Sequence, residues 1–290
     1  MLYYDRIKQE KIEEIEYQKK LLEFLYHTKL GRLLLKLFIA RPWFSKFRAL
    51  YQGSKWSKKD IKPFVEKHHI NTTKWNLSEF TSFNDFFIRK DNSISFIEDK
   101  KSLIAIADAK LMTYHISNNL MFRVKNTVYS VEDILGSAEK AEYFEGGTCL
   151  VYRLAVSDYH RYHYLDNGTL ISAKKINGEL HTVRPISEKY NVFTRNTRVV
   201  NILKTENFGI VAQVEVGALL VGKIVNHKKK TFRKNEEKGY FEFGGSTIVV
   251  FIEKEVELDE DIKKMNASGI EVQVKIGSKI GQVKEDYNEH

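Results

Sequence analysis

The sequence predicts an α+β fold in which a helical N-terminal region, residues 1–70, precedes a strand-rich single domain, residues 71–290, with mostly antiparallel sheets. Apolar residues recur with the spacing of one helix face over residues 30–38. Further along, apolar and polar residues alternate as they do on strands, over residues 210–216 and 270–276. No internal repeat and no long linker interrupts the second region, so we expect it to form one domain.

Length and composition place the chain among globular proteins. Its 290 residues suffice for a sizeable core, and 42% hydrophobic with 29% charged residues exclude a collagen-like, low-complexity or wholly disordered chain. The single cysteine, Cys149, excludes an internal disulfide framework and a cysteine-built zinc site. No apolar run approaches the roughly 18 residues that span a bilayer, and the first residues lack the apolar core of a secretory signal. We therefore expect a cytoplasmic protein, unless something holds it on a surface.

The positive charge is concentrated in one part of the helical region. The formal net charge of the chain is +9. Ten basic residues and a single acid, Asp60, lie between His27 and Lys62, so this window carries the whole excess and the rest of the chain sums to zero. The basic residues are Lys29, Arg32, Lys36, Arg41, Lys46, Arg48, Lys55, Lys58, Lys59 and Lys62.

The same window is amphipathic. One helix face is apolar, at Leu30, Leu33, Leu34, Leu37 and Phe38. Lys29, Arg32 and Lys36 fall mostly on another face. Pro42 is expected to end or kink the helix. Aromatic residues follow at Trp43, Phe44, Phe47 and Tyr51.

Such a window suits the surface of an anionic membrane, where each basic residue contributes about 1 kcal/mol. An ordinary helix that packs on the protein's own core with a solvated basic face is the simpler alternative. A nucleic-acid surface is a third interpretation. No recognised binding motif accompanies the basic residues, so we expect no nucleic-acid partner.

Beyond residue 70 the elements follow from local pattern. Short helices are predicted at Phe83–Arg89 and Ser130–Leu135, and Asp166-Asn167-Gly168 between strand-like stretches predicts a hairpin turn. The alternation at 210–216 and 270–276 predicts half-buried strands. The continuous apolar run over residues 247–252 predicts a strand that is buried on both faces.

The densest polar motif is Asp158-Tyr-His-Arg-Tyr-His163, in which His160 and His163 stand three residues apart. The two rings would share a face on a helix and would diverge in an extended turn. They could bind a metal only with distant carboxylates or with histidines that lack diagnostic spacing, at His68, His69, His181 and His227. We expect no metal site, and two partly exposed histidines near a strand end are the simpler interpretation of the motif.

Two further motifs could carry chemistry. Phe243-Gly-Gly-Ser-Thr247 reads as a turn or bulge before a strand, and it holds Ser246 beside the Gly245 carbonyl. Asp108 is embedded in an apolar stretch, where a carboxylate is costly to bury unless it is paired, and an imidazole is its natural partner. Asp108, His163 and Ser246 could then form an acid, base and nucleophile triad, although their spacing leaves open whether they meet.

Taken together, these motifs resemble the phosphatidylserine decarboxylase proenzymes, in particular the bacterial forms of about this length. The resemblance extends from Phe80 to the C-terminus. Two departures from the family pattern are Ala109, where the family usually has glycine, and Lys223, where it often has serine. The ordered landmarks are FTSFNDFFIRK (80–90), IADAK (106–110), VKNTVYSVEDILG (124–136), RLAVSDYHRYH (153–163), INGELHTVRP (176–185), NTRVVNILKTENFGIVAQVEVGALLVGKI (196–224) and KGYFEFGGSTIVV (238–250).

The resemblance implies a self-cleaving enzyme with a pyruvoyl cofactor that it makes from Ser246. Cleavage would fall between Gly245 and Ser246 and give a β chain of residues 1–245 and an α chain of residues 246–290, which stay together as a heterodimer. Asp108 and His163 match the family's processing acid and base. The Ser246 oxygen would attack the Gly245 carbonyl, elimination would release the upstream chain, and hydrolysis would leave the pyruvoyl group and ammonia.

The implied reaction converts phosphatidylserine to phosphatidylethanolamine and CO2. The substrate amine would form a Schiff base with the pyruvoyl ketone, which then accepts the electrons that CO2 leaves behind. His160 is the expected proton donor or the residue that positions the carboxylate.

A lipid substrate strengthens the expectation of a peripheral protein on the cytoplasmic face of the cell membrane, docked through Lys29, Arg32, Lys36, Trp43 and Phe44. The alternatives are a non-catalytic membrane-surface homologue, a metal-dependent hydrolase that uses His160 and His163, and a pyruvoyl enzyme with another headgroup or a soluble substrate. Further oligomerisation is left open.

Overall fold

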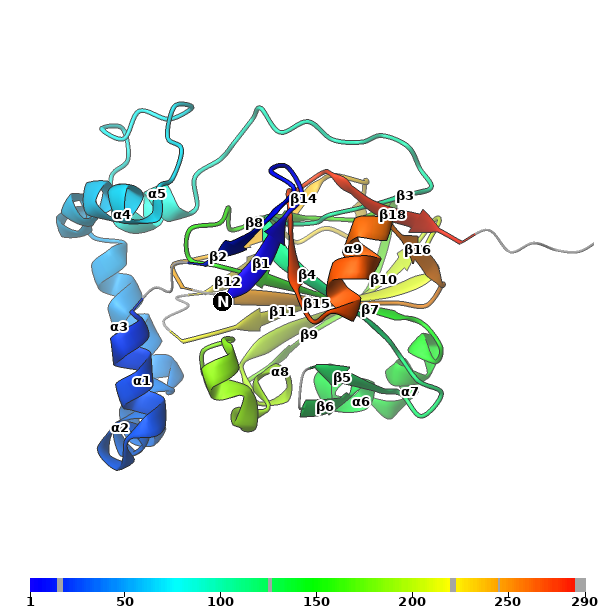
Figure 1. The fold of residues 1–290 in the computed structure, drawn as a ribbon, viewed down its shortest axis with the longest axis horizontal. Helices are drawn as coiled ribbons and strands as arrows, with labels where there is room; N and C mark the ends of the chain where they lie inside the picture. The colour runs from blue at the N-terminus through cyan, green and yellow to red at the C-terminus, as the bar shows by residue number, and fades with distance from the viewer. Residues whose placement is uncertain (15–17, 125–126, 220–222, 245, 285–290) are drawn as a thin grey trace, which may run out of the picture.

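The computed structural model describes residues 1–14, 18–124, 127–219, 223–244 and 246–284. It confirms the α+β class, with helices and mostly antiparallel sheets. Figure 1 shows three helices, α1 to α3, along one side of a strand-rich body. The described helices are α1 (Lys19–His27), α2 (Lys29–Leu34), α3 (Pro42–Gln52), α4 (Ile61–His68), α5 (Phe83–Phe87), α6 (Val131–Leu135), α7 (Ala138–Ala141), α8 (Val192–Arg195) and α9 (Glu260–Ala267), with a π-helical turn η1 (Leu35–Ile39) and 3-10 helices η2 (Lys55–Asp60), η3 (Glu142–Phe144) and η4 (Pro185–Tyr190).

The described strands form one large sheet and three small ones. The ten-stranded sheet has the order β13-β9-β10-β11-β15-β7-β4-β17-β1-β2, and the smaller sheets are β12-β14-β8, β16-β18-β3 and β5-β6. The strands are β1 (Leu2–Asp5), β2 (Glu10–Glu13), β3 (Ser102–Ile104), β4 (Ala109–His115), β5 (Met121–Val124), β6 (Thr127–Ser130), β7 (Thr148–Leu154), β8 (Arg161–His163), β9 (Gly168–Ile176), β10 (Arg198–Thr205), β11 (Ile210–Gly217), β12 (Ile224–Asn226), β13 (Thr231–Phe232), β14 (Glu237–Phe241), β15 (Ser246–Ile252), β16 (Val256–Leu258), β17 (Glu271–Val274) and β18 (Lys279–Val283).

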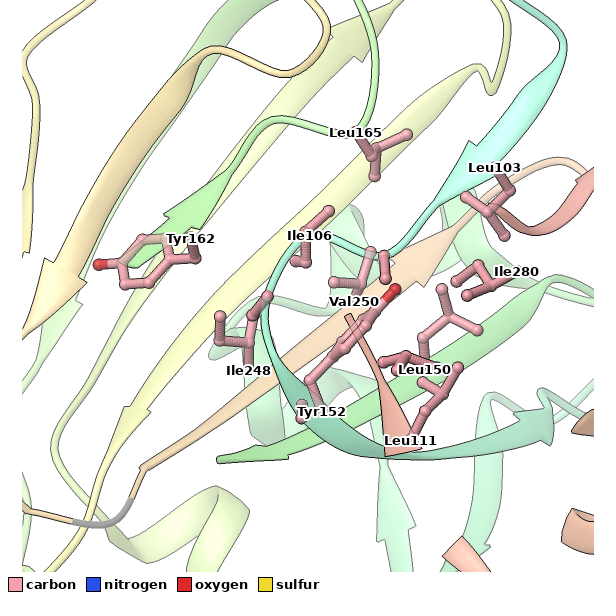
Figure 2. Packing of buried hydrophobic residues seen from close by; sticks show 14 of the residues in the cluster. Leu103, Ile106, Leu111, Leu150, Tyr152, Tyr162, Leu165, Ile248, Val250 and Ile280 are labelled. Atoms are coloured by element: carbon pink, nitrogen blue, oxygen red, sulfur yellow. The ribbon is translucent and has the colours of Figure 1, made fainter. Parts of the chain in front are cut away.

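Strand β15 is the centre of the large sheet. It pairs antiparallel with β11 on one side and with β7 on the other, and all of its residues are buried. Its alternate side chains enter two different cores, because neighbouring residues of a strand point to opposite faces. Ile248 and Val250 join the first core, which Figure 2 shows with Leu150 and Tyr152 of β7, whereas Phe251 joins the second. The predicted strand with two buried faces is therefore confirmed.

The short predicted helices are also confirmed, as α5 and α6. Helix α5 matters for the site because its phenylalanines bury against the segment that precedes β15. Phe83 and Phe87 contact the ring of Phe243 edge-to-face at centroid distances of 5.1 and 5.2 Å. The Asn84 side chain accepts a hydrogen bond from the Phe243 backbone at 3.1 Å. These contacts fix the position of Phe243, three residues before Ser246.

The helical arm comprises α1 to α4, residues 19–68. The helices α1 and α2 approach closely at Gly31, where a Cβ atom would lie only 2.1 Å from the Phe24 carbonyl oxygen. Thr28 caps α2 by accepting a hydrogen bond from the Gly31 amide at 2.9 Å. Pro42 is the first residue of α3, as expected for an interruption of the preceding helix. Tyr26 of α1 is fully buried and anchors the arm on the body.

The helical prediction is wrong for the beginning of the chain, where β1 and β2 form a hairpin at the edge of the large sheet. Strand β1 pairs in parallel with β17, about 270 residues away. The Arg6 side chain in the hairpin turn binds Asp259 and Asp261 at 2.8 and 2.6 Å. Pairing with a distant strand overrides the local preference of this charged segment. The division into regions at residue 70 stays a prediction.

Two further predictions need correction. Asp166-Asn167-Gly168 does not close a hairpin, because β8 pairs with β14 whereas β9 pairs with β10 and β13. The Asp166 carboxylate instead accepts hydrogen bonds from the backbone and side chain of Asn207 at 2.7 and 2.9 Å. Strand β11 is buried rather than half-buried. Its Glu215 is tolerated inside because Lys238 binds the carboxylate at 2.7 Å.

Candidate active site

Ser246 opens β15 at the centre of the large sheet, opposite Gly217 of β11 and Leu154 of β7. Its side chain is fully buried, and the Oγ atom has no hydrogen-bond partner within the described residues. Gly244 adopts a φ of 138°, a conformation that other residues rarely take. Gly245, the other half of the predicted cleavage site, lies outside the described residues. A buried hydroxyl without a partner is unusual and marks a candidate reacting group.

His160 precedes β8 and is fully buried against the ring of Phe87, with a centroid distance of 4.0 Å. Its Nδ1 atom lies 2.9 Å from the Asp158 carbonyl oxygen, which can only accept, so Nδ1 carries the proton. Nε2 therefore holds the lone pair, and it has no partner within the described part of the chain. Burial lowers the pKa of His160 to about 3, so the resting imidazole is neutral.

His163 ends β8 and is also mostly buried. Its Nδ1 atom donates to the Asn235 carbonyl oxygen at 2.6 Å, and its ring lies 5.1 Å from that of Phe96. Burial lowers the pKa of His163 as well. The side chain is thus a neutral imidazole with its lone pair on Nε2, the form that a general base needs.

Asp108 has partners other than those predicted. Its Oδ2 atom binds the Lys275 ammonium group at 2.7 Å, and its Oδ1 atom accepts the Ile276 amide at 2.9 Å. The segments of Asp108 and His163 are neighbours, because the His163 amide donates to the Ile106 carbonyl at 2.9 Å. Yet within the described ranges no hydrogen bond joins the side chains of Asp108, His163 and Ser246. The triad therefore stays a prediction.

A buried ion pair beside these residues was not predicted. Lys110 of β4 binds both oxygens of the Asp158 carboxylate at 2.9 and 3.0 Å, and the Ala155 amide donates to the same group. Burial would raise the pKa of Asp158, but the charges of Lys110 and Lys275 outweigh it and hold the pKa below its ordinary value. Lys110 ends the motif IADAK and Asp158 begins the motif DYHRYH. Looking for oppositely charged residues in these two motifs could therefore have predicted the pair.

A cavity of about 280 Å³ separates the helical arm from the body next to the predicted cleavage site. Apolar side chains of the arm line it, including Leu21 and Phe44, and Phe243 and Gly244 line it from the body. Arg48 lies at the same cavity and supplies a positive charge. The space is apolar with a basic group, which suits an amphiphilic molecule with a negative charge.

The predicted docking residues lie on the arm. Lys29, Lys36 and Trp43 are exposed, whereas Arg32 is half-buried and Phe44 turns partly inward to the cavity. Much of the predicted apolar face is exposed rather than packed on the core. The exposed large apolar side chains of this part are Leu30 (58%), Leu33 (53%), Leu37 (48%), Phe38 (46%), Trp43 (55%), Phe47 (74%), Leu50 (72%) and Trp56 (79%). Among the described helices, none is long and apolar enough to cross a bilayer.

Comparison with known proteins identifies the family. The family model described as phosphatidylserine decarboxylase matches residues 83–282. The chain is 49% identical over 279 residues to phosphatidylserine decarboxylase proenzyme 2 of Clostridium acetobutylicum. The aligned region covers 93% of this chain and 96% of that protein. It is 40% identical over 290 residues to the phosphatidylserine decarboxylase proenzymes of Clostridium novyi and Clostridium tetani, with coverage of 94% and 97% of this chain and 97% of each relative.

These comparisons define a decarboxylase of the carboxy-lyase class. The chain belongs to the phosphatidylserine decarboxylase family. The resemblance read from the sequence motifs is confirmed, including the match to proenzymes.

Proposed function

We propose that the chain is a self-cleaving proenzyme that converts phosphatidylserine to phosphatidylethanolamine and CO2 with a pyruvoyl group made from Ser246. The observation that carries the proposal is the buried Ser246 hydroxyl, which has no partner within the described residues and lies two residues after Gly244 at the apolar cavity. A hydroxyl that serves only packing would normally find a hydrogen-bond partner. Family membership supplies the substrate, and the cavity beside Gly244 is compatible with a lipid.

Self-cleavage requires a base, and His163 is our candidate. Its Nε2 lone pair would take the Ser246 proton while Nδ1–H stays bound to the Asn235 carbonyl. In the described arrangement this carbonyl orients the ring, which is the task that the triad gives to Asp108. For direct contact with His163, the Asp108 carboxylate would have to leave Lys275 and the Ile276 amide. Asp108 therefore acts in our proposal after a local rearrangement.

The covalent steps balance within the chain and one water. The Ser246 Oγ atom attacks the Gly245 carbonyl carbon, the peptide C–N bond breaks, and an ester forms. Loss of the Ser246 α proton then breaks the Cβ–O bond and releases a carboxylate at Gly245. Water hydrolyses the remaining dehydroalanine to a pyruvoyl group and ammonia. The pyruvoyl ketone would supply the electron sink for the bond electrons that CO2 leaves behind.

His160 is the candidate for proton transfer during decarboxylation. Because its pKa is about 3, the neutral imidazole is the resting form, and Nε2 accepts rather than donates. A proton that His160 gives to the substrate carbon must therefore first be taken up at Nε2. The Nδ1 atom could contact the substrate carboxyl group only if the Asp158 carbonyl were displaced. We therefore favour Nε2 as the atom that contacts the substrate.

The two chains would stay together after cleavage. The α chain begins with β15, which pairs along its whole length with β11 and β7, and it also supplies β17 between β4 and β1. Arg153 of the β chain binds Glu271 of the α chain in a buried ion pair. A processed heterodimer is therefore our expectation. Through the docking residues Lys29, Arg32, Lys36, Trp43 and Phe44, it would bind the cytoplasmic face of the cell membrane as a peripheral protein.

Intact-mass spectrometry of purified protein tests the proposal. We expect two fragments, with the smaller one beginning at position 246 and carrying a ketone instead of an amine. Ser246→Ala should abolish both cleavage and CO2 release from phosphatidylserine. Thr247→Val is a matched control, because it removes a neighbouring hydroxyl that is equally buried and unpartnered in the described structure.

Three outcomes would contradict the proposal. A wild-type chain that stays uncut would favour the non-catalytic homologue. Normal cutting of Ser246→Ala would exclude Ser246 as the nucleophile. Cleavage without CO2 release from phosphatidylserine vesicles would leave the self-processing intact but would point to a different headgroup or a soluble substrate.

A further inference from the structure

A second cavity, the polar cleft, lies between the N-terminal hairpin, the loops that follow α4 and α5, and the large sheet. Its volume is about 630 Å³. Charged side chains line it, and most of them are paired with one another. The ion pairs within the cleft are Lys74–Asp91 at 2.8 Å, Lys110–Asp158 at 2.9 Å and Lys275–Asp108 at 2.7 Å.

Arg89 lines the same cleft and has no such partner among the described residues. Its side chain is only 6% exposed, and no carboxylate of the described residues lies within ion-pair distance. One hydrogen bond holds it, from Nη1 to the Phe86 carbonyl at 3.3 Å, while the buried Nε atom has none within the described chain. The guanidinium lies over the rings of Trp75 and Phe86, at 5.1 and 4.8 Å from their centroids. The aromatic rings fix the position of the cation but leave its charge unneutralised.

Other buried cations of the described chain are satisfied. Arg153 binds Glu271, and Lys238 binds Glu215. Arg198 has no carboxylate partner in the described ranges but donates to four backbone carbonyl groups. Because a buried charge without a partner is costly, Arg89 is the exception that calls for an explanation. An anion that binds transiently in the cleft would supply the missing partner.

The cleft is linked to the proposed reaction centre through aromatic side chains. Phe87, two residues before Arg89, contacts the His160 ring at 4.0 Å and the Phe243 ring at 5.2 Å. Phe243 also lines the apolar cavity beside Gly244. Asp158 gives a second link, because its carbonyl oxygen accepts the His160 Nδ1 hydrogen bond at 2.9 Å and its carboxylate binds Lys110 of the cleft at 2.9 Å. A ligand with an apolar part and an ionic part could therefore meet the cavity with one end and Arg89 with the other.

We propose that Arg89 binds an oxyanion of the phosphoserine headgroup, either its carboxylate or its phosphodiester, in the polar cleft. This inference rests on the proposed function. A planar guanidinium can give two parallel hydrogen bonds to either group, which a lysine cannot reproduce. Arg89 would act in binding and positioning the substrate. It has no part in the attack of Ser246 on Gly245, so its loss should separate substrate binding from self-cleavage.

The test compares wild type with Arg89→Gln, Arg89→Lys and a matched control, Arg123→Gln, which neutralises an exposed arginine on β5. Self-cleavage is read by intact mass. The KM and kcat for phosphatidylserine in mixed micelles are read by CO2 release. Glycerophosphoserine and inorganic phosphate are soluble probes, whose binding is read by competitive inhibition and by the shift of the melting temperature.

We expect Arg89→Gln to cleave itself normally and to raise KM by roughly ten- to a hundredfold, the range for a lost hydrogen bond to a charged group, with a much smaller change in kcat. Inhibition by glycerophosphoserine should weaken by a similar factor, Arg89→Lys should lie in between, and Arg123→Gln should behave as wild type. Unchanged KM and inhibition in Arg89→Gln would overturn the assignment. If Arg89→Gln does not fold, the same comparison with Arg89→Lys decides.

The two probes distinguish the source of the anion. Inorganic phosphate that binds wild type as tightly as glycerophosphoserine, with both lost in Arg89→Gln, would make the cleft a site for free phosphate and would overturn the headgroup assignment. Failure of the proposed function would look different, because wild type would then release no CO2 from phosphatidylserine. In that case the melting-temperature shift with glycerophosphoserine in wild type and Arg89→Gln still decides whether Arg89 binds this headgroup.

Discussion

Neutralising Lys29, Arg32 and Lys36 together should weaken binding to anionic vesicles by about a hundredfold. These three side chains lie on α2 and η1, next to apolar residues that are exposed on the same part of the arm. Each basic residue near an anionic surface contributes about 1 kcal/mol, so the triple change to glutamine should cost about 3 kcal/mol. A factor of ten corresponds to about 1.4 kcal/mol, which gives the expected hundredfold.

Vesicle sedimentation at several salt concentrations measures this effect. Wild type should lose affinity as salt rises, because the Debye length falls from about 10 Å at 0.1 M to about 3 Å at 1 M. The triple variant should show a flatter salt dependence and should keep the part of its binding that comes from exposed side chains such as Leu33 and Phe47. At high salt the two proteins should therefore converge.

A matched control neutralises Lys174, Lys175 and Lys204, three exposed lysines on β9 and β10, away from the arm. It lowers the net charge of the protein by the same amount. If this control loses as much affinity as the arm variant, the attraction depends on overall charge and the arm has no special role. If the arm variant binds anionic vesicles as wild type does, the docking residues are wrongly assigned.

Two further predictions concern stability. Glu271→Gln should lower the free energy of unfolding by up to about 3 kcal/mol, because it leaves the buried Arg153 guanidinium with Glu14 as its carboxylate partner. Urea unfolding measures this loss, with the exposed Glu257→Gln as the control. Equal unfolding midpoints for the two variants would contradict the role of the ion pair. The lowered pKa of His160 means that the unfolded chain takes up a proton below about pH 6.5, whereas the folded chain does so only near pH 3. The free energy of unfolding should therefore decrease as the pH is lowered from about 6.5 to 3. The variant His160→Gln should show a flatter dependence on pH across this range.

Local pattern predicted the elements that are defined by their own residues. The continuous apolar run gave β15 correctly because both of its faces are buried, and the caps Ser82 and Ser130 begin the short helices α5 and α6. Pairing between distant segments could not be predicted in this way. The partner of β1 is β17, near the other end of the sequence, and no local signal in the first residues specifies it.

The same limit applies to the site. The motifs identified Ser246, His160 and His163 as candidates, and the structure places all three in buried positions. The spacing of the motifs could not show that Lys275 binds the Asp108 carboxylate, because the two residues are 167 positions apart in the sequence. Nor could it show that Arg89 lacks a carboxylate, since a missing partner is visible only when all neighbours are placed in space.

The two cavities explain how one buried serine could serve an amphiphilic substrate. The apolar cavity lies between the helical arm and Gly244. The polar cleft lies between the N-terminal hairpin, the loops that follow α4 and α5, and Asp108. Phe87 contacts both Phe243, which lines the cavity, and His160, whose Nδ1 atom is bound to the carbonyl of Asp158 in the cleft. A lipid whose apolar chains remain toward the arm while its ionic headgroup enters the cleft would place its amine between them, where the new terminus of β15 would form. Helix α5 carries Phe87 and ends just before Arg89, so its position would set both the wall between the cavities and the anchor for the headgroup.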